Sequence, residues 1–459
     1  MATSQRGNLD RYKLLGEKLC VGQKLPCHAF TRDGVLLLAR GETLATPTQL
    51  DRLLYPDIIF SNDPPAVLLP AIRKQQAALG IIEDSRIDKQ LAEELTALPL
   101  EKELALQTIA LEPAPPVVSF AEEITCARDL HQEAVYHVVD LLAQVRAGKS
   151  LDLYETTNLM HGVMESLKRN VRAFSSLLHL KVMDEFAFAH SINTCIFALM
   201  LARNVKPLIN LNTMGIGALL HDIGKSFLPP GLLSKEDHLT EADWELIRMH
   251  PQAGVDIIEL AKGYQKEYVD PILLHHERLD GSGYPAKLGG KDIALMGRIT
   301  AIADVYDAMT TDRPYRASFS PPTAMRWISS HADVLFDQEL VRTFIAVIGI
   351  FPVASLARMN TGELALVVKV NPQAVLKPIV LVVTDSDGTP LFKPKLINLA
   401  VPPFSYTKEI LGLENARDFR INVDEYLASI PEEKIADLES EALSMKASAE
   451  TFSALDTLA

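Results

Sequence analysis

The sequence predicts a mainly α-helical fold, in which one long helical domain is flanked by a small β-rich module on each side. Amphipathic helical spacing runs from Phe120 to about Ile345, whereas short apolar runs separated by turn residues fill about Val21–Asn62 and the region beyond residue 346. The 459 residues are enough for about three domains of ordinary size. We therefore expect one domain to hold the chemistry and the others to regulate it.

Changes in composition divide the chain into five segments. The first contains the strand-like runs "LPCHAF", "VLLLA" and "DIIF" and a short helix near "PTQLDRLL", and "DPP" and "EPAPP" punctuate the connector that follows it. The predicted segments are a β-rich module (residues 1–65), a partly helical linker (66–117), the helical domain (118–345), a second β-rich module (346–425) and a helical or disordered tail (426–459).

Individual elements can be predicted within the two main domains. The helical domain is expected to begin with "FAEEITCARDLHQEAVYHVVDLLAQV", which ends at "RAGKS", and to continue with "LDLYETTNLMHGVMESLKRNVRAFSSLL". In the second β module, "ELALVVKV" and "PIVLVVTDSDGTPLF" are strand-like. The turn residues "DSDG" between two apolar runs predict a β-hairpin.

The composition narrows the class of protein. A net charge of -14 argues against non-specific nucleic-acid binding, so a phosphate ligand would need local cations from basic side chains or metal. No apolar run resembles a signal peptide or is long enough to span a bilayer, which favours a cytoplasmic protein. The four cysteines have no zinc-like spacing and are too few for a disulfide framework.

Histidine and aspartate residues interrupt helical stretches that are otherwise apolar. "HDIGK" at 221–225 follows "MGIGALL", and on an α-helix its lysine would share a face with the histidine and the aspartate. Burying these groups without compensation would be costly, and a metal ion would satisfy most of that demand. Similar positions are His190, His250 at the end of "EADWELIRMH", the pair His275 and His276 after "DPILL", and Asp304.

Each of these residues also has a simpler interpretation. A single histidine is most often a satisfied core or surface residue, and Asp304 could make a hydrogen bond within its helix. The adjacent pairs "HD" and "HH" are harder to explain in this way, because two neighbouring polar groups in apolar helices need a shared partner. The complete set therefore favours a metal centre.

The ordered motifs resemble those of the HD-GYP family, a branch of the HD metal-dependent phosphohydrolases. They are "HDIGK", a histidine about thirty residues later, "HHERLDGSGYP" and "RITAIADVYDAMTTDRPYR". The similarity runs from about Asp184 to Arg316 and extends more loosely to "FDQELVRTF". It implies a multi-helix HD-type domain with a polynuclear metal centre that hydrolyses cyclic di-GMP.

The resemblance also implies a set of metal ligands. Asp222 would bridge two divalent ions, with iron or manganese the metals that the family and the mixed imidazole and carboxylate set favour. Our assignment gives His190, His221 and Asp304 to one ion. The other ion would be bound by His250, His275 and His276.

Further residues match family positions around the substrate. Asp222 and Lys225 are the candidate catalytic residues, and Lys225 would stabilise charge on the scissile phosphate. Glu277, Arg278 and Asp280 could brace the loop or support the ligands. The residues expected to contact the substrate are Lys225, Gly283, Tyr284, Pro285, Arg313 and Arg316, although the last two could also be solvated charges and the glycine-rich loop only a turn.

One position departs from the family pattern. Many members have glutamate four residues before the first histidine, where this chain has Phe186. Asp184 and Glu185 are nearby but out of helical register with His190. We therefore expect two metal ions, with hydrolysis stopping largely at the linear dinucleotide pGpG and its further cleavage to GMP slow.

The leading hypothesis is a cyclic di-GMP phosphodiesterase that acts in bacterial signalling. The alternatives are a catalytically weak effector that binds cyclic di-GMP, and an HD hydrolase of another nucleotide. The intact ligand set and Lys225 favour the enzyme, and the "GSGYP" loop argues against another nucleotide. Diguanylate cyclase domains or other signalling proteins are candidate partners through this loop, and a homodimer is left open.

Overall fold

The structure, a computed structural model, describes three short strands near the N-terminus and most of the chain from residue 116 onward. The described residues are 28–30, 36–38, 59–61, 116–179, 186–205, 209–229, 232, 240–311, 318–442 and 444. The short helix expected near "PTQLDRLL" and nearly all of the predicted linker lie outside this set. The predicted domain boundaries stay predictions.

The three N-terminal strands coincide with the strand-like runs of the sequence. They are β1 (His28–Phe30), β2 (Leu36–Leu38) and β3 (Ile59–Ser61), and they form an antiparallel sheet in the order β2-β1-β3.

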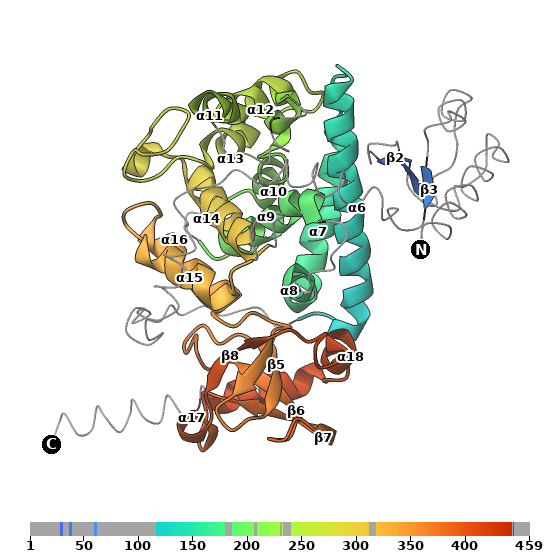
Figure 1. Cartoon of the computed structure of the whole chain (residues 1–459), viewed down its shortest axis with the longest axis vertical. Helices are drawn as coiled ribbons and strands as arrows, with labels where there is room; N and C mark the ends of the chain where they lie inside the picture. The colour runs from blue at the N-terminus through green and yellow to red at the C-terminus, as the bar shows by residue number, and fades with distance from the viewer. Residues whose placement is uncertain are drawn as a thin grey trace. The chain divides into compact units, whose positions relative to one another are not determined.

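The larger unit contains a helical body, as expected (Figure 1). Its α-helices are α6 (Phe120–Arg146), α7 (Tyr154–Arg169), α8 (Val171–His179), α9 (Phe186–Ala202), α10 (Leu211–Leu219), α11 (Glu241–Ile247), α12 (His250–Glu259), α13 (Val269–Leu274), α14 (Leu295–Thr310), α15 (Pro321–Ser330) and α16 (Gln338–Ile348). Short 3₁₀ turns lie at η1 (Ile223–Phe227), η2 (Lys266–Tyr268) and η3 (Gly290–Asp292). None of these described helices is both long and apolar enough to cross a membrane.

Local capping explains where several helices begin and end. Ser119 and Glu122 form a capping box before α6, and Thr240 and Asp243 form another before α11. Gly349 ends α16 with a φ of 85°, a conformation that favours glycine. These short-range signals are visible in the sequence, which is why α6 matches the predicted helix closely.

The second predicted helical window is divided in two. Asn170 between α7 and α8 has an extended backbone, with φ of -157° and ψ of 99°. Its side chain donates to the carbonyl oxygen of Val118 at 3.0 Å and accepts from the backbone N–H of Arg172 at 3.1 Å. The tertiary contact therefore overrides the helical periodicity that the sequence carries through this position.

The core of the helical body is centred on α9 and α14. Both helices are buried on nearly every side over their described side chains, which explains their continuous apolar character. Phe197 of α9, Tyr306 of α14 and Phe344 of α16 pack edge to face, with ring centroids 5.0 to 6.1 Å apart. This rigid contact fixes the two helices that carry His190 and Asp304.

A five-stranded antiparallel sheet follows the helical body. Its strands are β4 (Leu356–Met359), β5 (Leu364–Lys369), β6 (Ile379–Thr384), β7 (Pro390–Asn398) and β8 (Ile410–Glu414), in the order β7-β6-β5-β4-β8. The predicted hairpin joins β6 and β7: Asp385 accepts the backbone N–H groups of Asp387 and Thr389, and Gly388 has a φ of 82°. Two short helices, α17 (Phe404–Thr407) and α18 (Val423–Ala428), and a helical segment at 432–442 complete the unit.

A buried ionic contact joins the C-terminal segment to the helical body. Both carboxylate oxygens of Glu432 accept hydrogen bonds from the Arg172 guanidinium, at 2.8 and 2.7 Å. Glu432 also accepts from the backbone N–H of Phe120 and from the Asn170 amide, and Arg172 donates to the carbonyl oxygen of Val368 in β5. The Arg172–Glu432 pair therefore ties the start of α6, the start of α8 and the sheet together.

Candidate metal centre

The "HDIGK" motif forms a turn and not the continuous α-helix assumed from the sequence. α10 ends at Leu219, and His221 and Asp222 lie in the turn that leads into the 3₁₀ helix η1. Gly224 is required here, because a Cβ atom at this position would lie 2.0 Å from the carbonyl oxygen of His250. The tight turn and the close approach bring "HDIGK" against α12.

His250 also differs from its predicted place. It begins α12 and does not end the helix before it, since α11 stops at Ile247. Pro251 explains the difference, because proline lacks the N–H that the interior of a helix needs but fits its first turn.

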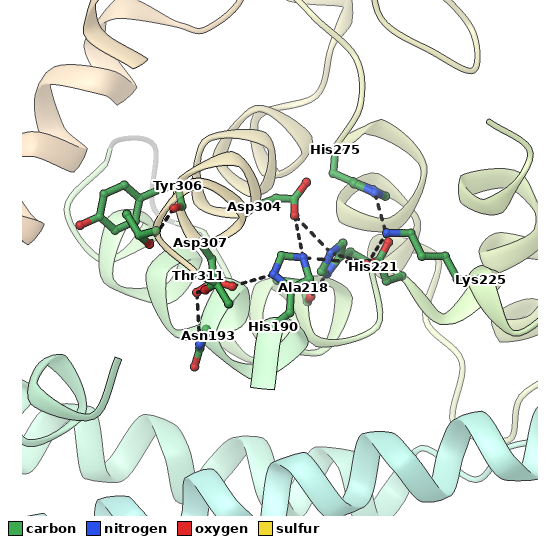
Figure 2. Close-up of polar contacts among 12 residues, drawn as sticks. His190, Asn193, Ala218, His221, Lys225, His275, Asp304, Tyr306, Asp307 and Thr311 are labelled. Atoms are coloured by element: carbon green, nitrogen blue, oxygen red, sulfur yellow. Dashed lines mark hydrogen bonds and ion pairs between the residues drawn. The ribbon is translucent and has the colours of Figure 1, made fainter. Parts of the chain in front are cut away.

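The seven predicted ligands gather in one buried cluster from separate elements. His190 comes from α9, Asp304 from α14 and the pair His275 and His276 from the end of α13. All seven side chains are buried: His190, His221, Asp222, His250, His275, His276 and Asp304. Figure 2 shows Asp304 directed toward His190 and His221.

The distances between donor atoms suit metal binding. Three combinations of these residues place all their ligand atoms within 4.8 Å of one another: Asp222 with His250, His275 and His276; His190 with His221 and Asp222; and His221 with His275 and Asp304. Ligand atoms at about 2.0–2.2 Å from one ion lie within about 4.4 Å of each other. His190 Nε2 lies 2.9 Å from Asp304 Oδ1, and His221 Nε2 lies 3.6 Å from the same oxygen.

Asp222 faces both halves of the cluster. Its Oδ1 atom lies 3.3 Å from His250 Nε2 and 3.8 Å from His275 Nε2. Its Oδ2 atom lies 3.4 Å from His221 Nε2 and 3.9 Å from His190 Nε2. A carboxylate with one oxygen toward each set of imidazoles is suited to bridge two cations.

Several ligand atoms in the cluster have no hydrogen bond. They are Nε2 of His221, Oδ1 of Asp222 and Oδ2 of Asp304, all fully buried. Buried polar atoms without partners are costly, and their convergence here fits a bound ion, which would satisfy them together. The residues present therefore fit a metal centre.

Backbone carbonyls fix the orientation of three histidines. The Nδ1 atoms of His221, His250 and His275 each lie 2.8 Å from a carbonyl oxygen three residues earlier, in Ala218, Ile247 and Ile272. A carbonyl oxygen can only accept, so Nδ1 carries a proton and Nε2 faces the centre, where a bound ion would take its lone pair. Burial opposes charge on His221, but the Asp222 and Asp304 carboxylates raise its pKa to about 10.

The pKa values of the histidines differ between the two sides of the cluster. Burial lowers the pKa of His250, and it lowers the pKa values of His275 and His276 well below the usual range. These three imidazoles are therefore neutral, which is the form that binds metal. Burial opposes charge on His190 too, but hydrogen bonds to Asp304 and Asp307 raise its pKa to about 9.

The carboxylates of the cluster are ionised. Burial alone would raise the pKa of Asp222, but the charges of Lys225 and His221 hold it well below its usual range. Burial acts in the same way on Asp304, and its contacts with His190 and His221 hold its pKa well below the usual range. Two buried anionic oxygen ligands are available to a cation.

The loop at 281–285 with the sequence "GSGYP", called the GYP loop below, folds back onto the candidate ligand histidines. The ring of Tyr284 stacks on His276 with centroids 4.4 Å apart, and the backbone N–H of Tyr284 donates to the His276 carbonyl oxygen. A Cβ atom on Gly283 would lie 2.5 Å from the Arg278 nitrogen and the His276 oxygen. Glycine therefore permits the close approach that sets Tyr284 against the centre.

Glu277 holds the segment that follows the GYP loop through its backbone. Its two carboxylate oxygens accept the backbone N–H groups of Ala286 at 2.7 Å and Leu288 at 2.9 Å, and the side chain is buried. Arg278 donates to the carbonyl oxygens of His275 and Glu277, and Asp280 accepts the N–H of Ser282. These contacts fit the loop-bracing role considered for the three residues.

Some candidates lie outside the described residues. Arg313 and Arg316 belong to the undescribed segment 312–317, and Asp184 and Glu185 to 180–185. Phe186 begins α9, but only its backbone is described. The roles assigned to these residues stay predictions.

The sequence-based set omitted Asp307, which contacts a candidate ligand directly. Its Oδ2 atom lies 2.7 Å from His190 Nδ1, and its side chain is 1% exposed. A signal was present: in "ADVYDAM", Asp307 follows Asp304 by three residues in an apolar helix.

A helical body with a buried histidine and aspartate cluster defines the class of HD-domain proteins. The HD domain family matches residues 174–340, and the family described as the KOW domain associated with HD domain matches residues 356–416. Together with the relatives below, these matches show that the chain belongs to the HD-GYP family.

The relatives include two enzymes with different named substrates. The cyclic di-GMP phosphodiesterase PA4108 of Pseudomonas aeruginosa is 32% identical over 362 residues, which cover 76% of this chain and 86% of the relative. The 3'3'-cGAMP-specific phosphodiesterase 2 of Vibrio cholerae is 35% identical over 127 residues, 28% of this chain and 24% of the relative. A solved HDG"Y"P protein from Bdellovibrio bacteriovorus, Bd1817, gives a TM-score of 0.38 at 16% identity, covering 71% of this chain and 95% of that chain.

Proposed function

We infer that this protein is a metal-dependent phosphodiesterase that hydrolyses cyclic di-GMP to the linear dinucleotide pGpG. The observation that carries the inference is the convergence of seven buried ligand residues on one centre. The similarity to a cyclic di-GMP phosphodiesterase over 86% of that relative's length supports the substrate.

The proposed ligand assignment follows the two faces of Asp222. His190, His221 and Asp304 would hold one divalent ion, and His250, His275 and His276 the other, with Asp222 between them. Iron or manganese suits this mixed nitrogen and oxygen set. When bound, the ions would neutralise the phosphodiester and supply a hydroxide at neutral pH.

The protein's own groups would position the substrate and exclude water. Lys225 is buried beside Asp222 and would place a positive charge next to the scissile phosphate. Tyr284 and Gly283 would frame the ligand from the GYP loop, whose position Glu277 maintains. Pro285, Arg313 and Arg316 complete the proposed substrate contacts. Partners at the GYP loop, dimerisation and a cytoplasmic location stay predictions.

The decisive experiment follows the products of hydrolysis. Full-length protein, purified anaerobically and loaded with Fe²⁺ or Mn²⁺, is incubated with cyclic di-GMP, and the products are resolved by chromatography. We expect pGpG from the wild type and from His161→Ala, which changes an exposed histidine of α7, and none from His221→Ala. Equal rates in folded His221→Ala and wild type would contradict the assignment.

The same assay separates the two alternatives. Binding of cyclic di-GMP without product in the metal-loaded protein would indicate an effector. Faster hydrolysis of 3'3'-cGAMP than of cyclic di-GMP would indicate the other substrate class, to which one relative is assigned by name.

A further inference from the structure

The histidines of the centre differ in what holds their second nitrogen. In His221, His250 and His275, Nδ1 donates to a neutral backbone carbonyl. In His190, Nδ1 lies 2.7 Å from the carboxylate of Asp307. The half of the centre that contains His190 therefore has an anionic group behind a ligand.

A network of donors holds the Asp307 carboxylate in place (Figure 2). Asn193 donates its amide N–H to Oδ1 of Asp307 at 3.1 Å, and Thr311 donates its hydroxyl at 3.4 Å. His131 of α6 lies 2.9 Å from the Asn193 oxygen, which can only accept, so the imidazole donates. The network runs from α6 through α9 to α14.

We propose that Asp307 is a positioning residue that fixes His190 as an Nε2 ligand and increases the electron density at the ion that His190 would bind. The inference rests on the proposed metal centre. A carboxylate that accepts the Nδ1 proton sets the tautomer and increases the basicity of Nε2, whereas a backbone carbonyl sets the tautomer with a weaker effect.

Two substitutions of Asp307 distinguish the effect of its hydrogen bond to His190 from the effect of its negative charge. In Asp307→Asn, the amide oxygen still accepts from His190 and the shape is nearly unchanged, but the negative charge is lost. The NH₂ group also takes the place of the oxygen that accepts from Asn193 and Thr311. In Asp307→Ala, both the hydrogen bond and the charge are lost. Glu123→Gln is a matched control, because Glu123 is a buried carboxylate of α6 whose partners are Ser166 and Arg169.

The experiment measures metal binding without hydrolysis. Metal-free full-length protein is titrated with Mn²⁺ in competition with a chelating dye, and thermal unfolding of the metal-free variants is recorded in parallel. We expect two Mn²⁺ ions in the wild type and in Glu123→Gln with unchanged affinities. Asp307→Asn should weaken one ion by about 10- to 100-fold and leave the other unchanged. Asp307→Ala should weaken the same ion further.

A second readout tests the charge directly. In the iron-loaded protein, Asp307→Asn should shift the reduction potential of one ion to a more positive value, since less negative charge stabilises the oxidised ion. Wild-type affinity and potential in Asp307→Asn would overturn the inference while leaving the proposed function intact. Equal weakening of both ions, with a lower unfolding temperature, would show a structural role only. A wild type that binds no Mn²⁺ would overturn the metal centre and the inference together.

Discussion

The ammonium group of Lys225 lies 2.7 Å from Oδ2 of Asp222, and both side chains are buried. The contact places a positive charge at the oxygen that faces His190 and His221. We predict that Lys225→Ala lowers the hydrolysis rate by about 10²- to 10³-fold, the typical loss for one electrostatic contact in a transition state. Metal content should fall much less, because Lys225 is not one of the proposed ligands.

Elemental analysis and initial rates on the same preparation test this prediction. Lys168→Ala is the control, since this lysine of α7 pairs with Glu165 at an exposed position. Parallel loss of metal and activity in Lys225→Ala would show that the ammonium maintains Asp222 and does not act on the phosphate.

The GYP loop should depend on Glu277. In Glu277→Gln one carboxylate oxygen becomes an NH₂ group, which faces a backbone N–H donor and cannot accept it. An unsatisfied buried donor costs about 1–3 kcal/mol, so the loop should loosen. We expect a higher KM with metal content unchanged, whereas Glu267→Gln, at an exposed position, should leave KM unchanged. Loss of metal from Glu277→Gln would assign the residue to the centre itself.

The residue at position 186 should determine whether the centre binds two or three metal ions. A phenyl ring four residues before His190 offers no oxygen ligand, so we predict two tightly bound ions per chain and slow cleavage of pGpG. Phe186→Glu places a carboxylate one helical turn before His190 and should allow a third ion. Elemental analysis of anaerobically purified protein tests both statements. Three ions in the wild type would show that a residue other than Phe186, such as Asp184 or Glu185, supplies the additional ligand.

Glu432 should contribute to the stability of the larger unit. Glu432→Ala leaves the buried Arg172 guanidinium without its carboxylate, and we expect a loss of up to about 3 kcal/mol in the free energy of unfolding, since Glu432 is partly exposed. Glu433→Ala, one residue further and exposed, is the control. Denaturant unfolding monitored by circular dichroism measures both, and equal midpoints would show that the contact is energetically neutral.

Local signals explain which features could be predicted from the sequence. α6 was predicted closely because its capping box and apolar spacing lie within one stretch of chain. The hairpin after β6 follows from "DSDG" alone. The seven candidate ligand residues stood out because each interrupts an apolar stretch, and the structure places them together.

Contacts between distant residues explain what was missed. The break at Asn170 depends on Val118 and Glu432, which no helical periodicity reveals. The "HDIGK" turn depends on the approach of Gly224 to His250, and Asp307 acquires its importance only when α9 packs beside α14. Local sequence therefore specifies the ligand types, and tertiary packing specifies what supports them.

The contact between Arg172 and Glu432 can form only late in the synthesis of the chain. The chain leaves the ribosome from its N-terminus, so Phe120, Asn170 and Arg172 emerge long before Glu432, which follows Arg172 by 260 residues. Until then the Arg172 guanidinium has no anionic partner in this contact, and the junction between α6 and α8 is incomplete. Closure of this junction is therefore a late, long-range step that needs the helical segment at 432–442.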